Sequence, residues 1–318
     1  MWLPLLVVAL ALLLVYRWHR QKQILENLSD KYVLITGCDT GLGNVLAKQL
    51  DRHGMRVLAA CLTEKGAEDL KKETSSRLQT AIVDISDSQS VSSAVEWVTR
   101  IVGDAGLWGL VNNAGTIVPA APIGWLKKED YARVLNINLL GTVDVTLKLL
   151  PLVRRARGRI IIVSSILGRL SVFGGGYALS KFGLEAFGDS LRRELSSFGV
   201  KVSIVEPGAF KTSIISSPAF EGLAQIWKNL PAEIKESYGE QYYKKFAQTF
   251  QALADAASST FYKVSDCMEH ALTACHPWTR YSAGWDAKLY FIPLSYLPTC
   301  ISDLLLSVYL PKPYRRVE

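Results

Sequence analysis

The stretch KYVLITGCDTGLG, residues 31–43, joins a short β-rich run to a turn that contains Gly37, Gly41 and Gly43. A helix is expected to follow over residues 43–54. Side chains in this turn would keep the backbone away from a phosphate group, whose charge the amino terminus of a helix stabilises. The order of strand, glycine turn and helix therefore predicts a dinucleotide-binding turn, with an ordinary tight turn as the simpler alternative.

Outward from this stretch, short β-rich runs alternate with helical runs along the 318-residue chain. Such alternation is typical of a parallel sheet with helices on both faces. We therefore predict one α/β domain, a doubly wound parallel sheet, over residues 30–290, with a helical insertion at 211–262. The strands are predicted over 31–37, 55–62, 77–85, 107–115, 158–165 and 200–208.

The amino terminus is apolar and uncharged through residue 16, and Arg17, Arg20 and Lys22 follow. As a helix this run would rise about 24 Å, close to the thickness of a bilayer's hydrocarbon layer. Positive charge precedes the apolar run of a cleaved signal peptide, so residues 1–20 are predicted to be an uncleaved membrane anchor. The positive-inside bias places the domain on the cytosolic face of an intracellular membrane, for which the endoplasmic reticulum is the expectation.

Two further features concern the membrane. The apolar residues 288–313 are interrupted by Pro293, Pro298 and Asp303, so we expect a segment that dips into the membrane or covers the substrate. The sequon at residues 27–29 would be a competing sign for a lumenal domain, although it lies very near the membrane.

The charge and cysteine patterns indicate no nucleic-acid partner and no metal. The net charge is +7, and the basic run at 154–159 is interpreted as a helix end whose cations suit the negative end of the helix dipole, with an anionic membrane surface as the alternative. The five cysteines are scattered, which indicates a reducing environment. Residues 267–276, CMEHALTACH, lack paired zinc-ligand spacing and predict an amphipathic helix that ends at His276.

Within SSILGRLSVFGGGYALSK, residues 164–181, Tyr177 precedes Lys181 by four positions. In a helix this spacing puts the phenol and the ammonium on one face. A phenol with a pKa of about 10 is a poor base at neutral pH, and a neighbouring cation lowers that pKa. The pair suits removal of a hydroxyl proton during alcohol oxidation, whereas a solvated surface pair is the alternative for the spacing alone.

Taken together, the motifs resemble the short-chain dehydrogenase/reductase family over residues 30–285. DKYVLITGCDTGLG, LWGLVNNAG and CMEHALTACHP further resemble the membrane-anchored retinol dehydrogenases and the oxidative 3α/17β-hydroxysteroid dehydrogenases of the type 6 group. The resemblance implies a single Rossmann-type domain and an NAD-dependent oxidoreductase, and it allows a homodimer. The motifs that carry it are the glycine turn, Asn112-Asn113-Ala114-Gly115, Asn138, the serine pair, Tyr177-x-x-x-Lys181 and Pro207-Gly208.

The resemblance implies that Tyr177 takes the substrate proton, that Lys181 favours the phenolate and holds the nicotinamide ribose, and that Asn138 holds a water of the proton relay. A serine would hydrogen-bond the substrate oxygen. Counting thirteen residues back from Tyr177 selects Ser164, whereas alignment through the following glycine selects Ser165, which we choose. The residues expected at the cofactor are Thr36, Gly37, Asp39, Gly41, Leu42, Gly43, Asp84, Asn112, Ala114, Gly115, Tyr177, Lys181, Pro207, Gly208 and Thr212.

Cofactor and substrate preferences follow from two more features. The second strand ends in Cys61-Leu62-Thr63 without the acidic ribose ligand of many NAD-using relatives, but Asp39 would repel a 2′-phosphate, so NAD is expected. Aromatic residues of the insertion either enclose a large apolar molecule or pack their own helices. With the anchor, they suggest a lipid-soluble alcohol, retinol or a hydroxysteroid; a membrane-attached NAD-binding module without catalysis is the alternative. These aromatic residues are Phe220, Trp227, Tyr238, Tyr242, Tyr243, Phe246 and Phe250.

Overall fold

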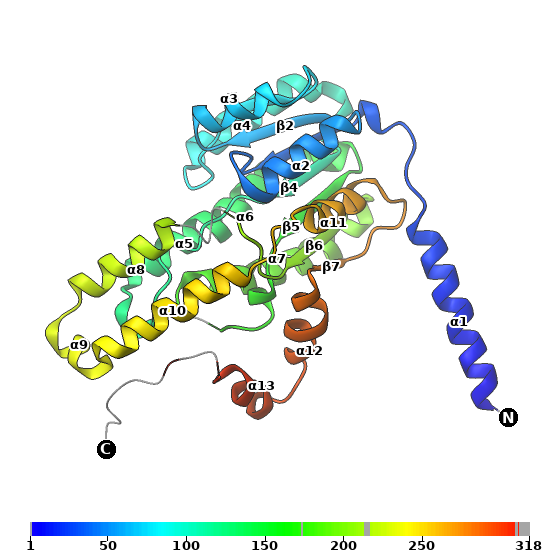
Figure 1. Ribbon diagram of the computed structural model, residues 1–318. Coiled ribbons are helices and arrows are strands. Elements are labelled where there is room, and N and C mark those ends of the chain that lie inside the picture. Colours follow the sequence, from blue (N-terminus) through cyan, green and yellow to red (C-terminus); the bar gives the residue numbers. More distant parts are fainter. Residues whose placement is uncertain (1, 173, 213–216, 309–310, 312–318) are drawn as a thin grey trace.

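The computed structural model describes residues 2–172, 174–212, 217–308 and 311. Within them, seven strands form one parallel sheet in the order β3-β2-β1-β4-β5-β6-β7 (Figure 1). The order reverses between β1 and β4, so the doubly wound sheet predicted from the sequence is confirmed. The strands are β1 Tyr32–Thr36, β2 Arg56–Cys61, β3 Gln79–Ile82, β4 Gly109–Asn112, β5 Arg159–Val163, β6 Lys201–Pro207 and β7 Arg280–Ala283.

Helices cover both faces of the sheet. One face packs against α2, α3 and α11, and the other against α4, α6 and α7. The helices are α1 Trp2–Gln21, α2 Gly41–Arg52, α3 Glu64–Lys72, α4 Ser88–Val102, α5 Lys128–Leu135, α6 Thr142–Arg155, α7 Gly176–Leu195, α8 Ser217–Asn229, α9 Ala232–Tyr238, α10 Glu240–Ala256, α11 Tyr262–Thr273, α12 Ile292–Leu294 and α13 Thr299–Leu306.

The alternation of side chains along each strand explains why the central strands are apolar at every position. In β1, Val33 and Ile35 enter the core beside α2 and α11, whereas Leu34 enters the opposite core. In β5, Ile161 enters the core beside α2 and α11, and Ile160 enters the opposite core. A strand with helices on both faces has no solvent side, so its sequence is a continuous apolar run.

In the last part of the domain one strand was not predicted and one predicted helix end was wrong. The strand β7 was missed because only two of its four residues, Tyr281 and Ala283, are buried apolar side chains. The helix in the stretch 267–276 ends at Thr273 rather than at His276, because Ala274 pairs with Ile24 in an antiparallel bridge. Both differences arise from pairing partners that are distant in sequence.

The basic run at 154–159 is only partly a helix end. Helix α6 ends at Arg155, as its composition predicted. Arg159 instead belongs to β5, where it is buried and its Nη1 donates to the carbonyl oxygen of Ala271 at 2.8 Å. Its guanidinium also lies over the ring of Trp108, so this cation is held at the first residue of the interior strand β5.

Helix α1 extends away from the domain (Figure 1), and its described side chains are almost all exposed. Residues 20–25 are nonetheless fastened to residues 270–276 of the domain, an arrangement that we call the exit clamp. Its contacts are Leu25 N to Thr273 O at 2.8 Å, Cys275 N to Gln23 O at 2.7 Å, His270 Nε2 to Gln21 O at 2.8 Å, and Arg20 Nη2 to His276 Nδ1 at 3.0 Å.

The run Lys128–Arg155 is long and apolar enough to cross a membrane by length and composition. It combines α5, a π-helix at Asn136–Gly141 and α6, and it packs against α4, α7 and β4. These contacts identify the run as a helix of the domain core.

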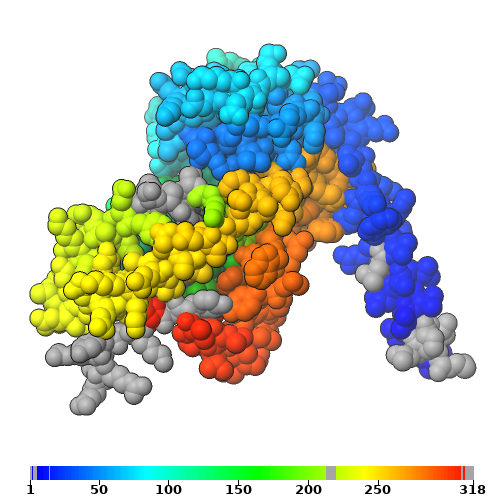
Figure 2. Space-filling model, in the orientation of Figure 1, coloured from blue at the N-terminus to red at the C-terminus, as the bar shows by residue number. Residues whose placement is uncertain are grey.

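After β7, the chain continues through a π-helix at Ala287–Phe291 into α12 and α13, on the side of the domain toward which the free end of α1 points (Figures 1 and 2). This segment exposes large apolar side chains, which we call the C-terminal apolar face. Within the expected 288–313 segment, residues 309–310 and 312–313 lie outside the described residues. The C-terminal apolar face comprises Leu289, Tyr296, Leu297, Ile301, Leu304, Leu305 and Val308.

Candidate active site

The glycine turn packs tightly against the end of β4. Gly37 has a φ of 72°, and a Cβ on it would lie 2.8 Å from the Cα of Ala114. A Cβ on Gly43 would collide with the carbonyl oxygen of Gly37 and the side-chain amide of Asn113. The turn therefore leaves bare backbone at the amino terminus of α2, a cradle that fits the pyrophosphate of a dinucleotide.

Thr36 and Asn113 brace this cradle from within. Thr36 Oγ1 accepts hydrogen bonds from Asn113 N at 3.0 Å and Ala114 N at 3.1 Å. Asn113 Nδ2 donates in return to Thr36 O at 2.9 Å and Gly37 O at 3.1 Å. Asn113 was missing from the predicted site residues, although it stands inside the quoted Asn-Asn-Ala-Gly motif. Its role depends on the spatial pairing of β1 with β4.

Asn112 and Leu42 point away from the cradle. The Asn112 side chain is buried and its Nδ2 donates to Thr146 Oγ1 of α6 at 2.8 Å. Leu42 packs against the core beside α2. The side chain of Asn112 thus joins β4 to α6, and that of Leu42 packs α2 against the core. Only the backbone of these two residues borders the glycine turn.

Asp39 brings an acidic group to the end of β2. Its carboxylate accepts hydrogen bonds from Leu62 N at 2.7 Å, from Thr63 N at 2.9 Å and from Thr63 Oγ1 at 2.7 Å. The strand itself has no acidic residue at this position, so the glycine turn supplies one. The backbone N–H groups that could receive a 2′-phosphate are thereby occupied by a carboxylate.

Tyr177 and Lys181 lie together in the first turns of α7. Lys181 Nζ is 5.4 Å from the centre of the Tyr177 ring and donates to Val163 O, at the end of β5, at 2.8 Å. Burial lowers the pKa of Lys181 to about 8, while Glu185 acts to raise it. Burial raises the pKa of Tyr177, and a hydrogen bond with Ser165 lowers it. The pKa of Tyr177 is therefore raised, whereas a neighbouring lysine was expected to lower it, because desolvation is the larger effect.

The two serines at the end of β5 face different partners. Ser165 hydrogen-bonds Tyr177, and its Oγ also accepts from Leu167 N at 3.1 Å, which caps a short 3-10 helix. Ser164 Oγ donates to Lys181 O at 3.4 Å, and Ser164 acts to lower the pKa of Glu185. Ser165 therefore both caps the 3-10 helix and places its hydroxyl next to the phenol.

Asn138 is fully buried in the π-helix Asn136–Gly141, where its side chain fixes the loop after β4. Its Nδ2 donates to Thr116 O at 2.8 Å and to Ser180 Oγ at 3.0 Å, and its Oδ1 accepts from Thr116 N at 2.8 Å. A Cβ on Gly115 would lie 3.2 Å from this oxygen and 3.9 Å from Lys181 Nζ. Asn138, Gly115 and Lys181 therefore meet at one place.

The loop after β6 reaches the same edge of the sheet. Gly208 N donates to Ala283 O at 2.8 Å, and Thr212 lies 3.8 Å from where a Cβ on Gly41 would be. Asp286 holds this loop by accepting from Ala209 N at 2.7 Å, and a Cβ on Gly208 would strike its carboxylate. Sequence reasoning missed Asp286, since nothing in its local pattern links it to the loop.

Asp84 and Pro207, both predicted at the cofactor, differ in burial and in position relative to the site. Asp84 is exposed after β3, and its Oδ1 accepts from Ser86 N at 2.8 Å and Ser86 Oγ at 2.7 Å. Pro207 is the buried last residue of β6. The structure thus brings the strand ends at Thr36, Asn112, Val163 and Pro207 to one edge, as parallel strands require, with Asp84 at its periphery.

The aromatic residues of the insertion divide into two clusters. Phe220 and Phe250, with ring centres 5.2 Å apart, join Tyr177, Ile117 and Ala120 in one apolar cluster. The others pack around Trp125 and one another, which is the alternative of aromatic residues that pack their own helices; enclosure of an apolar molecule stays a prediction for Phe220 and Phe250. The second cluster contains Trp227, Tyr238, Tyr242, Tyr243 and Phe246.

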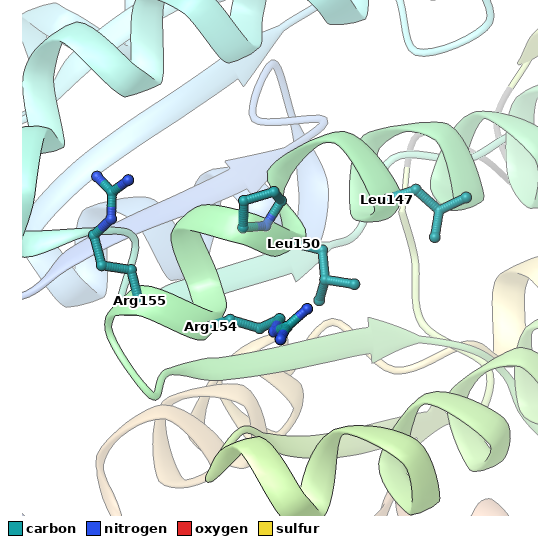
Figure 3. A pocket seen from close by; sticks show the side chains of 5 residues that line it. Leu147, Leu150, Arg154 and Arg155 are labelled. Atoms are coloured by element: carbon teal, nitrogen blue, oxygen red, sulfur yellow. The ribbon is translucent and has the colours of Figure 1, made fainter.

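A hollow on the outer side of α6 is lined by Leu147, Leu150, Pro151, Arg154 and Arg155 (Figure 3). None of the predicted site residues borders it. The hollow lies on the helix surface, whereas the candidate site lies at the carboxyl ends of the strands.

Comparison with known proteins identifies the family. The short chain dehydrogenase profile matches residues 31–219. The chain is 56% identical to retinol dehydrogenase 16 of Mus musculus over 307 residues, which cover 96% of each protein. It is 54% identical to 17-beta-hydroxysteroid dehydrogenase type 6 of Homo sapiens over 318 residues, which cover all of both proteins.

Solved structures agree on the fold. A short chain dehydrogenase/reductase from Burkholderia phymatum in complex with NAD superposes with a TM-score of 0.69 at 17% identity, over 92% of this chain and all of that one. A short-chain dehydrogenase from Streptomyces avermitilis superposes with a TM-score of 0.68 at 23% identity, over 87% of this chain and 94% of that one. The chain therefore belongs to the short chain dehydrogenase family and is a nicotinamide-dependent oxidoreductase.

Proposed function

We propose that the protein oxidises a lipophilic alcohol, retinol or a 3α- or 17β-hydroxysteroid, with NAD as the hydride acceptor. The observation that carries the proposal is the meeting of Ser165, Tyr177 and Lys181 beside a glycine cradle that fits a dinucleotide. The names of the relatives, retinol dehydrogenase and 17-beta-hydroxysteroid dehydrogenase, support both substrate classes.

A nicotinamide held at the glycine cradle would supply the acceptor for the hydride of the alcohol carbon. Tyr177 takes the hydroxyl proton, and Ser165 hydrogen-bonds the substrate oxygen as charge develops on it. Lys181, whose Nζ donates to Val163 O, would hold the cofactor ribose and favour the phenolate of Tyr177. Asn138 fixes the neighbouring loop and would hold a water that receives the proton.

The preference for NAD over NADP rests on Asp39. Its carboxylate occupies the N–H groups of Leu62 and Thr63, so a 2′-phosphate would meet a negative charge in place of donors. A ribose 2′-hydroxyl, by contrast, can donate a hydrogen bond to a carboxylate.

We further propose that residues 1–20 anchor the protein in the endoplasmic reticulum membrane and that residues 30–290 form the catalytic domain on its cytosolic face. The helical insertion at 211–262 covers the substrate, through Phe220 and Phe250. The segment 288–313 contacts lipid through its C-terminal apolar face, which lies on the side of the domain toward which α1 points. A homodimer stays a prediction.

The deciding experiment incubates membranes containing the full chain with NAD and a panel of retinoids and hydroxysteroids, and follows NADH absorbance. Turnover of at least one alcohol of these classes is expected. The matched control is Tyr177→Phe, which should lose turnover and retain NAD binding, because the base is lost and the glycine cradle is intact. Wild-type turnover by this variant, or no turnover of any panel alcohol by the wild type, would contradict the proposal.

A further inference from the structure

A cluster of charged side chains joins helix α7, which carries Tyr177 and Lys181, to the strands β6 and β7. Glu185 of α7 and Glu206 of β6 are 7% and 1% exposed. Arg280 of β7 lies 3.1 Å from Glu185, 3.1 Å from Asp189 and 3.4 Å from Glu206. Arg169 adds a second cation, 3.0 Å from Glu206. We call these five residues the ion cluster.

Such a cluster is not explained by stability alone. Removing charges from water is expensive, and apolar side chains of similar volume often stabilise a core equally well. Glu185 Oε1 is buried, and it has no hydrogen-bond partner among the described residues. Burial raises the pKa of Glu185, and Glu206 adds to this, whereas Ser164 and Arg280 lower it. Because burying the Glu185 carboxylate is costly, its presence beside the candidate active site indicates a functional role there.

The position of Glu185 defines that task. It stands one helical turn after Lys181 on α7. It also lies beside Ser164, because a Cβ on Gly168 would be 2.6 Å from Ser164 Oγ and 3.1 Å from Glu185 Cγ. Among the described residues, the titratable groups that face Lys181 are Tyr177 and Glu185, both on the same helix. Burial works against the charge on Lys181, and Glu185 is the carboxylate that opposes this effect.

We propose that Glu185 is a positioning residue that keeps the Lys181 ammonium charged and in place, and that Arg280 holds Glu185 for this purpose. The inference rests on the proposed function in one respect, namely that Lys181 binds the cofactor ribose. Arg280 comes from β7, so the last strand of the sheet supports the chemistry at the start of α7 without touching substrate or cofactor.

The test is the variant Glu185→Gln, which keeps the shape and removes the charge. Loss of the negative charge disfavours protonated Lys181, and Arg280 then adds positive potential in the same direction. NADH binding, followed by its fluorescence, should therefore be lost at a pH about one unit lower than in the wild type. The pH profile of kcat/KM should move the same way on both limbs, because the added positive potential also favours the Tyr177 phenolate.

Two controls separate charge from structure. Glu194→Gln makes the same change at an exposed position of α7 and should leave the profile unmoved. Glu185→Asp keeps the charge but withdraws it, so a smaller shift in the same direction is expected, and this variant decides the matter if Glu185→Gln does not fold. An unshifted NADH-binding profile in the folded Glu185 variant, or an equal shift in Glu194→Gln, would overturn the proposal. Because NADH binding needs no alcohol, a wild type that binds NADH but oxidises no panel alcohol would refute the proposed function and leave this test intact.

Discussion

At the scale of single residues, the two serines at the end of β5 make a sharp comparison. They are adjacent and both buried, but Ser165 hydrogen-bonds Tyr177 whereas Ser164 faces Lys181 O and Glu185. Ser165→Ala should lower kcat about 100-fold, the usual effect of losing a donor to a developing oxyanion. Ser164→Ala should lower it far less. Steady-state kinetics on both variants tests this prediction. A larger loss in Ser164→Ala would identify Ser164, thirteen residues before Tyr177, as the catalytic serine.

Asp39 gives a second residue-scale prediction. The wild type should use NAD at least about tenfold more efficiently than NADP, because the carboxylate would repel a 2′-phosphate. Asp39→Ser removes the charge and frees the N–H groups of Leu62 and Thr63, so the ratio of kcat/KM should move toward NADP. Comparable efficiencies in the wild type would refute the assignment and direct attention to Lys65, just after β2.

Sequence motifs identify residues that act through local pattern. Tyr177, Lys181 and the glycines of the turn lie in short segments with fixed spacing, so their association could be predicted. Asn113 and Asp286 could not, because the first acts through the pairing of β1 with β4 and the second acts on a loop 77 positions away. Contacts of this kind are created by the fold.

At the scale of elements, α10 carries two neighbouring phenylalanines with different surroundings. Phe246 and Phe250 stack with ring centres 6.5 Å apart, but Phe250 belongs to the cluster around Tyr177 and Phe246 to the cluster around Trp125. Phe250→Leu should raise the KM for the alcohol by about tenfold, since a changed apolar contact alters specificity by that order.

Phe246→Leu is the matched control, with the same change in volume four residues earlier on the same helix. It should lower the melting temperature but leave KM close to the wild-type value. Equal effects on KM would mean that the insertion contacts the substrate along its whole length, or not at all.

The strands show which elements a sequence can predict. The central strands, such as Arg159–Val163, are apolar on both faces and stand out as continuous runs. The edge strand β7 is short and alternates Arg280 and Ser282 with two buried side chains, a pattern that many loops share. It is a strand because β6 offers an unpaired edge and because Glu185 and Glu206 receive Arg280.

At the scale of the whole molecule, the orientation on the membrane can be tested directly. Protease added to intact microsomes should digest the domain without detergent, because the cations after the apolar run favour a cytosolic domain. A glycosylation sequon placed in α9 should stay unmodified, and a lumenal resident protein should survive as the control for intact vesicles. Protection of the domain together with glycosylation of the added sequon would mean that the charge bias had been overridden.

The exit clamp has a consequence for biosynthesis. Gln21 and His270, which it joins, are 249 positions apart in the chain. A ribosome adds roughly 5–20 residues per second, so on the order of 10 to 50 s separate the synthesis of the two sides. Throughout that interval residues 20–25, which connect the proposed anchor to the nascent domain, would lack their binding partners, because residues 270–276 are not yet synthesised. A translational pause before α11 would prolong this interval. Until the exit clamp forms, residues 20–25 are accessible to proteases, and the orientation of the nascent domain relative to the bilayer is not fixed.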